Sequence, residues 1–266
     1  MQEQRQLDLD AHRDAGDLIA TTLVLFARHA LLFLSVTLVV VAPVTLAVDG
    51  VWAGRLADGG AAQVPLAAAA AAAALAFLMP VLVTALHVTI VRDLGDGRIP
   101  TVPEALRSAA PRFPLAIAAV VLYTGLAFGG LLLLIVPGIW AFVAGYFATQ
   151  VAVMERRGPF NAFWRSSELV AGRWWRTAGT LLLGWVLLSI ISYPAGRAID
   201  AIDAGVVYLV LYTALQVVTL SLTALFGTLL YFSLRARKEQ PFGAAPVPTY
   251  LPPVSPTPAA QPPADL

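Results

Sequence analysis

Six long apolar segments without a charged side chain are the feature that most constrains this 266-residue chain. They cover residues 31–48, 64–91, 113–136, 139–154, 177–195 and 206–234. A helix that crosses the hydrocarbon core of a bilayer needs about 20 mostly apolar residues, and only helices or closed barrels satisfy every backbone polar group there. These segments lack the alternating pattern of barrel strands. The sequence therefore predicts an all-α polytopic membrane protein with six transmembrane helices.

Composition excludes several other classes of protein. Apolar residues make up 59% of the chain and charged residues 12%, whereas a soluble domain carries about 45–50% and about 25%. So few charges cannot cover a soluble globule, and a net charge of +1 does not favour nucleic acid as a partner. The chain has no cysteine and only three histidines, with no carboxylates at ligand spacing. We therefore expect no disulfide, metal or cofactor.

The distribution of basic residues predicts the orientation. Of the 17 lysines and arginines, only Arg55 and Arg197 fall on one side of the six spans. The others lie in the N-terminal stretch, in the second-to-third and fourth-to-fifth connections, and after the last span. Loops that remain in the cytoplasm are enriched in lysine and arginine. We expect both termini in the cytoplasm. The preference for arginine over lysine is typical of a high-GC bacterial genome, so we expect a bacterial cytoplasmic membrane.

Three regions follow from this pattern. Residues 1–13 form a polar N-terminal segment, and residues 14–238 contain the six spans. Residues 239–266 are rich in proline and poor in charge, which predicts an extended, disordered tail that is either inert or a docking peptide.

A short, more polar helical segment precedes the first, third and fifth spans, at residues 14–33, 103–110 and 159–172. Apolar and aromatic side chains with arginine on the polar face suit the headgroup boundary, so we expect three amphipathic interfacial helices on the cytoplasmic side. Tryptophan favours the same depth, and we interpret three residues as anchors: Trp164, Trp174 and Trp175. Four arginines are predicted to contact anionic lipid: Arg112, Arg165, Arg173 and Arg176. The alternative is that these helices only brace the bundle.

Proline and glycine positions predict local geometry within the spans. Pro137 and Gly138 separate the third and fourth spans without a charge, which predicts a tight helical hairpin turn there. Pro80 lies inside the second span and predicts a kink. Gly125 and Gly129 form a Gly-x-x-x-Gly pair that favours close helix packing.

Uncharged polar residues inside the spans leave two interpretations open. Tyr146, Gln150 and Gln216 either line a small polar cavity or hydrogen-bond to neighbouring helices, because buried polar groups in lipid need partners. His87 lies near the cytoplasmic end of the second span. It is either a neutral packed histidine or a proton or ligand site.

One stretch carries a resemblance to a known family. It includes the segment 135–140, Glu155, Arg165 and Ser166, and the segment 172–176. These residues resemble the membrane domain found beside the catalytic barrel of some bacterial glycerophosphoryl diester phosphodiesterases, and related integral membrane proteins of uncharacterised function. The chain has Ala144 and Gly145 where such proteins often have a basic residue, and no segment matches the β/α barrel. The resemblance implies a membrane domain rather than phosphodiester hydrolysis.

Function is predicted mainly from the chemistry that the sequence lacks. The chain shows no nucleophile motif, phosphate-binding glycine loop or metalloprotease helix. We therefore expect a non-enzymatic scaffold that contacts membrane lipids, a second copy of itself or another membrane protein. The alternative is a transporter or permease component for a small or lipid-like substrate. An intramembrane lipid-modifying enzyme is a third interpretation, although no converging polar residues favour it.

Overall fold

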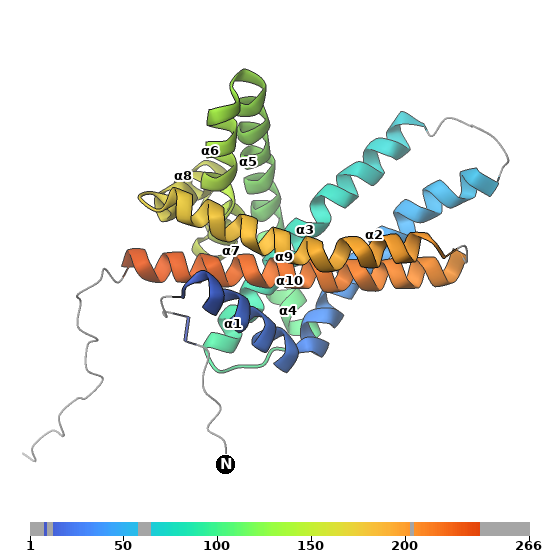
Figure 1. The fold of residues 1–266 in the computed structure, drawn as a ribbon, viewed down its shortest axis with the longest axis horizontal. Coiled ribbons are helices and arrows are strands. Elements are labelled where there is room, and N and C mark those ends of the chain that lie inside the picture. The colour runs from blue at the N-terminus through green and yellow to red at the C-terminus, as the bar shows by residue number, and fades with distance from the viewer. Residues whose placement is uncertain (1–7, 10–12, 58–64, 203–204, 240–266) are drawn as a thin grey trace, which may run out of the picture.

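Three pairs of helices make up most of the chain in a computed structural model, which describes residues 8–9, 13–57, 65–202 and 205–239 (Figure 1). The pairs are α2 (Ala30–Ala57) with α3 (Leu66–Gly95), α5 (Phe113–Leu133) with α6 (Ile135–Gly145), and α9 (Trp174–Asp200) with α10 (Gly205–Glu239). The remaining elements are α1 (Ala15–Arg28), α4 (Val102–Ala109), the 3-10 turn η1 (Ala110–Arg112), α7 (Ala148–Glu155) and α8 (Pro159–Val170). The described residues contain no strand, which confirms the all-α prediction.

Six segments are long enough and apolar enough to cross a membrane. They are Ala30–Val48, Leu66–Gly95, Val102–Leu133, Ile135–Glu155, Trp174–Asp200 and Gly205–Glu239. Each overlaps one predicted span, so the prediction of a polytopic membrane protein is confirmed. The third segment combines α4, η1 and α5, and the fourth combines α6 and α7. Most of the predicted proline-rich tail and of the polar N-terminal segment lies outside the described residues.

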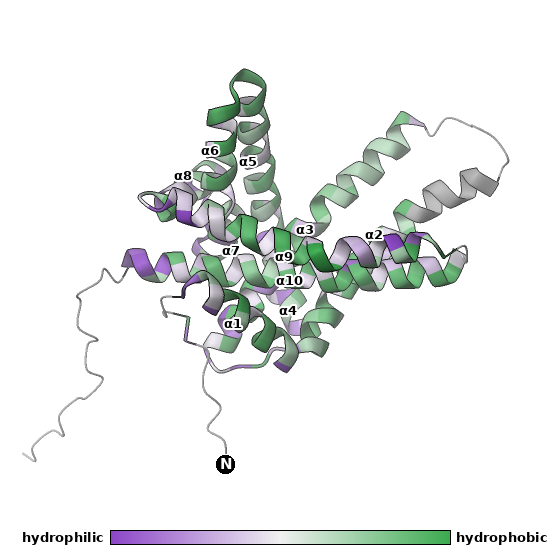
Figure 2. Ribbon diagram, viewed as in Figure 1, coloured by the Kyte–Doolittle hydropathy of each residue, from purple (hydrophilic) through white to green (hydrophobic). Residues whose placement is uncertain are grey.

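The three helix pairs spread apart from one common region, which also contains α1, α4, α7 and α8 (Figure 1). We call this region the base. The far ends of the pairs, where each pair turns, point in different directions. Figure 2 shows mainly apolar helix pairs, whereas hydrophilic segments gather on α1, on α8 and at the end of α10, with a further one near the end of α9.

The buried core lies in the base and not at the far ends of the helix pairs. Its fully buried side chains come mainly from the second half of α3, from α7 and from the second half of α10: Val83, Leu86, Ile90, Val151, Leu225 and Leu229. Large apolar residues toward the far ends are exposed, including Phe77, Leu132, Val136 and Ile191. Lipid tails are as apolar as these side chains, so such exposure carries little cost in a membrane.

The turn between α5 and α6 lies at Leu134 rather than at Pro137 and Gly138. Leu134 has extended dihedral angles (φ −155°, ψ 133°), and α6 begins at the next residue. Pro137 lies in the first turn of α6, where a missing amide hydrogen removes no helical bond. The predicted hairpin is present, but the prediction of its turn residues was wrong. Gly138 instead lets the two helices approach, because a Cβ added to Gly130 would lie 2.9 Å from the Cα of Gly138.

The fourth predicted span, residues 139–154, is not one continuous helix. It is divided into α6 and α7 by a break at Tyr146 and Phe147. After the break, α7 packs against α3, α5 and α8 within the base. The hydropathy pattern gave no indication of this break, since the residues on both sides of it are apolar.

One separate helix precedes a helix pair three times along the chain: α1 before α2 and α3, α4 before α5 and α6, and α8 before α9 and α10. The first predicted short segment, 14–33, is divided at His29, because α1 ends at Arg28 and α2 begins at Ala30. Pro80 lies inside α3, and the helix continues on both sides of it. The placement of the short helices at a membrane surface, and the kink at Pro80, stay predictions.

Candidate functional site

Five cations gather where the start of α1, the start of α9 and the end of α10 meet in the base. Their side chains belong to Arg13, Arg173, Arg176, Arg237 and Lys238. Gly172 ends the connection from α8 with a φ of +80°, a left-handed conformation that glycine adopts without strain. Arg173 is the residue directly before α9, and Arg176 lies in the first turn of that helix.

Arg13 is fixed to α10 by its backbone. Its amide donates to the Ser233 hydroxyl at 3.2 Å, and the Arg237 guanidinium donates to its carbonyl oxygen at 2.9 Å. One guanidinium nitrogen donates to the Asp8 carbonyl oxygen, whereas Nη1 is buried and has no hydrogen-bond partner among the described residues. Burial lowers the pKa of Arg13, and attraction to Asp8 and Asp17 offsets part of that effect. The side chain is therefore a desolvated cation with an unused donor.

Asp14 is a carboxylate that pairs directly with this cluster. It accepts a hydrogen bond from Arg176 and lies 3.8 Å from an Arg237 nitrogen. The side chain of Arg173 makes no hydrogen bond or ion pair within the described part of the chain. Two cavities open between these side chains, one of about 30 Å³ and one of about 160 Å³, and Arg173 and Arg237 line both. The arrangement provides an excess of guanidinium donors around a space, which suits an anion.

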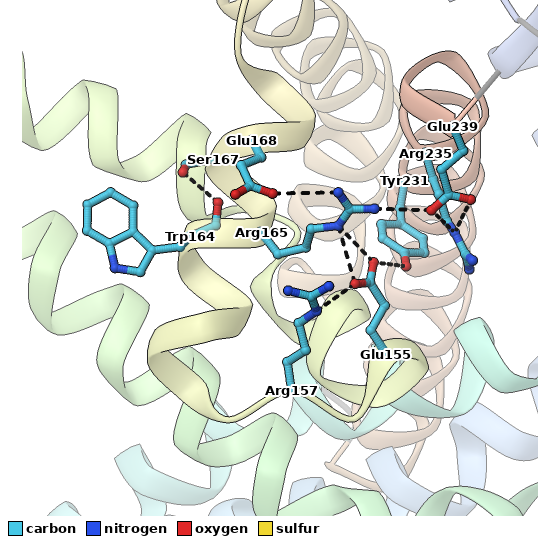
Figure 3. Close-up of polar contacts among 9 residues, drawn as sticks. All are labelled: Glu155, Arg157, Trp164, Arg165, Ser167, Glu168, Tyr231, Arg235 and Glu239. Carbon is cyan, nitrogen blue, oxygen red and sulfur yellow. Dashed lines mark hydrogen bonds and ion pairs between the residues drawn. The ribbon is translucent and has the colours of Figure 1, made fainter. Parts of the chain in front are cut away.

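Arg165, one of the four predicted lipid contacts, lies in a different cluster (Figure 3). Its guanidinium is paired with Glu155 at 3.3 Å, Glu239 at 3.1 Å and Glu168 at 3.6 Å. Burial alone would lower the pKa of Arg165, but attraction to Glu155 and Glu239 raises it above its usual value. Three carboxylates already satisfy this cation, so the structure does not bring it together with Arg173 and Arg176.

Glu155 is the centre of this second cluster (Figure 3). Besides Arg165, it pairs with Arg157 at 2.8 Å and accepts a hydrogen bond from the Tyr231 hydroxyl at 3.4 Å. Arg235 extends the cluster along α10 by pairing with Glu239 at 3.1 Å. The cluster therefore joins the end of α7, the helix α8 and the end of α10 through charge-assisted hydrogen bonds.

The remaining predicted contact residues are spread over the base. Arg112 is half-buried, and its Nη1 donates to the Ser108 carbonyl oxygen at 2.7 Å, so it also lies apart from the cation cluster. The rings of Trp164 and Trp175 are exposed, at 59% and 83%. Trp174 stacks edge-on against Trp175, and its Nε1 lies 3.5 Å from the Trp140 carbonyl oxygen.

Of the three polar residues predicted to line a cavity inside the spans, Tyr146 and Gln150 lie close to the same glycine of α10. A Cβ added to Gly227 would lie 3.4 Å from the Tyr146 hydroxyl and 3.5 Å from Gln150 Nε2, so both side chains contact α10 at this glycine. The side-chain oxygens of Gln150 and Gln216 are buried and have no partner among the described residues. The three cavities that the structure describes in the base are lined by other residues.

His87 is fully buried and stacks on Phe33, with ring centroids 5.1 Å apart. Its Nδ1 lies 2.9 Å from the Val83 carbonyl oxygen, and its Nε2 has no partner in the described residues. Across those residues, no group of three or more histidine, aspartate or glutamate side chains is arranged to hold a metal ion.

Residues 108–236 match a family described as a domain of unknown function (DUF7847). No curated protein and no solved structure matches the chain. The resemblance to the phosphodiesterase membrane domain is not confirmed by these comparisons. The matched region includes Arg173 and Arg176, whereas Arg13 and Arg237 lie outside it. Three cations of the cluster, Arg13, Arg237 and Lys238, were not predicted from the sequence, since nothing in their local pattern indicates that they lie beside the start of α9.

Proposed function

We propose that this protein is a non-enzymatic scaffold of a bacterial cytoplasmic membrane that binds anionic lipid at its base. In this proposal both termini lie in the cytoplasm, and the base lies at the inner surface of the membrane. The observation that carries it is the cluster of Arg13, Arg173, Arg176, Arg237 and Lys238. Clusters of lysine and arginine beside a membrane-spanning helix attract anionic headgroups.

The surroundings of the cluster support the same function. The exposed rings of Trp164 on α8 and Trp175 on α9 are the amphipathic kind of side chain that favours the headgroup region. Phe160 on α8 is also exposed, at 65%. An apolar and aromatic surface beside uncompensated arginines suits the boundary between headgroups and acyl chains.

Lipid that remains bound after purification tests this function. The triple variant Arg173→Gln, Arg176→Gln and Arg237→Gln removes three cations of the cluster, and we expect it to retain less anionic lipid than the wild type. The matched control removes three arginines from elsewhere in the base: Arg92→Gln, Arg98→Gln and Arg107→Gln. If both variants lost the same amount of anionic lipid, net charge alone would explain the effect and the proposed site would be contradicted. Unchanged lipid content in a folded cluster variant would also contradict the proposal.

A second candidate function is transport of a small or lipid-like substrate. The unpartnered side-chain oxygens of Gln150 and Gln216 support it, because an unsatisfied polar atom inside a membrane helix bundle is costly and often functional. Substrate-dependent quenching of Trp185, which lies 6.1 Å from the Tyr146 ring between centroids, would favour transport. Unchanged tryptophan emission across a panel of polar and lipid-like solutes would count against it.

A further inference from the structure

The cavities between α1, α9 and α10 combine buried positive charge with unused hydrogen-bond donors. Arg13 Nη1 is buried without a partner, and Arg173 forms no ion pair within the described residues. Asp14, a carboxylate paired within the cluster, already accepts from Arg176 and faces Arg237. Among the described residues, the partly buried Arg13 keeps a buried donor without a partner, and the exposed Arg173 side chain has no carboxylate beside it. Guanidinium groups with unused donors around a cavity favour a bound anion.

The donors around the cavities match a tetrahedral oxyanion. A guanidinium offers a planar fork of N–H groups that binds phosphate oxygens in pairs. The first amides of α9, a helix of 27 residues, have no partner within that helix and add a partial positive charge at the same place. The Ser233 hydroxyl lines the smaller cavity beside Arg13. The larger cavity, of about 160 Å³, has room for one phosphate group with part of its substituent.

We propose that this site binds a phosphate monoester group. A monoester carries about −1.5 to −2 charge at neutral pH and three terminal oxygens, whereas a phosphodiester carries one charge and two such oxygens. Arg173, Arg237 and Lys238 line the larger cavity, so three oxygens can each meet a separate cation, and Arg13 lines the smaller cavity beside it. Where the ligand is a lipid, this inference rests on the proposed function and specifies its headgroup as a phosphate monoester. A soluble phosphate monoester presents the same chemistry.

Lipid retention by the full-length protein in nanodiscs tests the site. The discs contain phosphatidylcholine with either phosphatidate, a monoester, or phosphatidylglycerol, a diester, and bound lipid is counted by native mass spectrometry. We expect phosphatidate to be retained in preference at neutral pH. The preference should decline as the pH falls through about 6, where a phosphate monoester loses its second charge. Inorganic phosphate added as a competitor separates a soluble source from a lipid source.

Variants connect the preference to the cavity. Arg173→Gln removes an exposed side chain without a partner, so folding is retained, and we expect phosphatidate retention to fall about fivefold. Arg13→Gln should have a similar effect and serves as the second variant. The matched control, Arg107→Gln, removes an exposed arginine from α4 and should leave retention unchanged.

The outcomes distinguish this inference from the proposed function. Equal retention of phosphatidate and phosphatidylglycerol overturns the monoester site but leaves anionic-lipid binding intact. Retention that is unaffected by Arg173→Gln also overturns the site. Retention of neither lipid overturns both proposals. Competition by inorganic phosphate supports a phosphate-specific site with a soluble source, and a phosphatidate preference that resists competition supports a lipid source.

Discussion

The hydroxyl of Ser166 on α8 donates a hydrogen bond to the carbonyl oxygen of Ala144 on α6, at 2.6 Å. The same hydroxyl accepts a hydrogen bond from the amide of Phe147, at 3.2 Å, across the break between α6 and α7. Helix ends leave backbone groups without intrahelical partners. The buried Ser166 side chain, which belongs to a third helix, therefore supplies hydrogen-bond partners to backbone groups at the break in the fourth span.

We predict that Ser166→Ala lowers the free energy of unfolding by about 1–3 kcal/mol, because it leaves the Ala144 carbonyl and the Phe147 amide buried without a partner. The measurement is chemical denaturation in detergent micelles. The matched control is Ser167→Ala, whose exposed hydroxyl bonds only to the Trp164 carbonyl oxygen of its own helix. We expect the control to change the free energy by less than about 0.5 kcal/mol, and equal effects would contradict a special role for Ser166.

The α5–α6 hairpin depends on glycine at one contact and tolerates alanine at another. A Cβ at position 138 would collide with the backbone of Leu131, whereas Gly125 has open space around it. We expect Gly138→Ala to destabilise the protein by about 1–3 kcal/mol through overpacking. Gly125→Ala should be neutral or stabilise it by up to about 1 kcal/mol, because alanine favours a helix. Thermal unfolding in detergent measures both, and a neutral Gly138→Ala would show that the two helices are not in close contact.

Hydropathy predicted the spans because each crossing must be apolar over its whole length. It did not predict which helices are neighbours at the base. Arg13 and Ser233 bond across 220 positions of sequence, and no local pattern around either residue encodes that contact. The same limit explains Arg165, which was predicted to contact a headgroup but whose partner Glu239 lies 74 positions away. Two of the five cations in the cluster, Arg173 and Arg176, could be predicted from the sequence, and the other three required the tertiary fold.

The turn between α5 and α6 was predicted at the wrong residues for a related reason. Pro137 is compatible both with a turn and with the first turn of a helix, since neither position needs its amide hydrogen. Only the packing of Gly138 against α5 distinguishes the two, and it places the turn at Leu134. The break at Tyr146 has no sequence signal of this kind, because the Ser166 hydroxyl that bridges it comes from another helix.

The charge cluster around Glu155 should contribute more to stability than an exposed ion pair. The side chains of Glu155 and Arg165 are only 13% and 19% exposed. We predict that Glu155→Gln lowers the free energy of unfolding by about 1–3 kcal/mol, because hydrogen bonds to the charged carboxylate are lost at a mostly buried site. Arg157→Gln is the control. Its side chain is 45% exposed, so we expect a loss of less than about 1 kcal/mol. A control loss as large as that of Glu155→Gln would show that burial does not strengthen this cluster.

A buried hydrogen bond fixes α2 against α10 and allows the packing of the base to be measured. The hydroxyls of Thr37 and Ser221 lie 2.7 Å apart, and the Ser221 hydroxyl also lies 3.4 Å from the Phe33 carbonyl oxygen. A double-mutant cycle with Thr37→Val and Ser221→Ala should give a coupling free energy of about 0.6 kcal/mol and at most about 1.7 kcal/mol, the range found for hydrogen bonds between membrane helices.

The control cycle for this contact uses Thr45 in place of Thr37 as the first mutated position. The Thr45 hydroxyl bonds only to the Val41 carbonyl oxygen of its own helix, at 2.9 Å. Thr45→Val combined with Ser221→Ala should therefore be additive. Steric trapping or reversible denaturation in bicelles provides the four free energies of each cycle. Coupling that is the same in both cycles would mean that the Thr37 hydroxyl does not reach α10. The neighbouring positions of Phe33, Ser221 and His87 in the base would then have to be revised together, because the Phe33 ring stacks on His87.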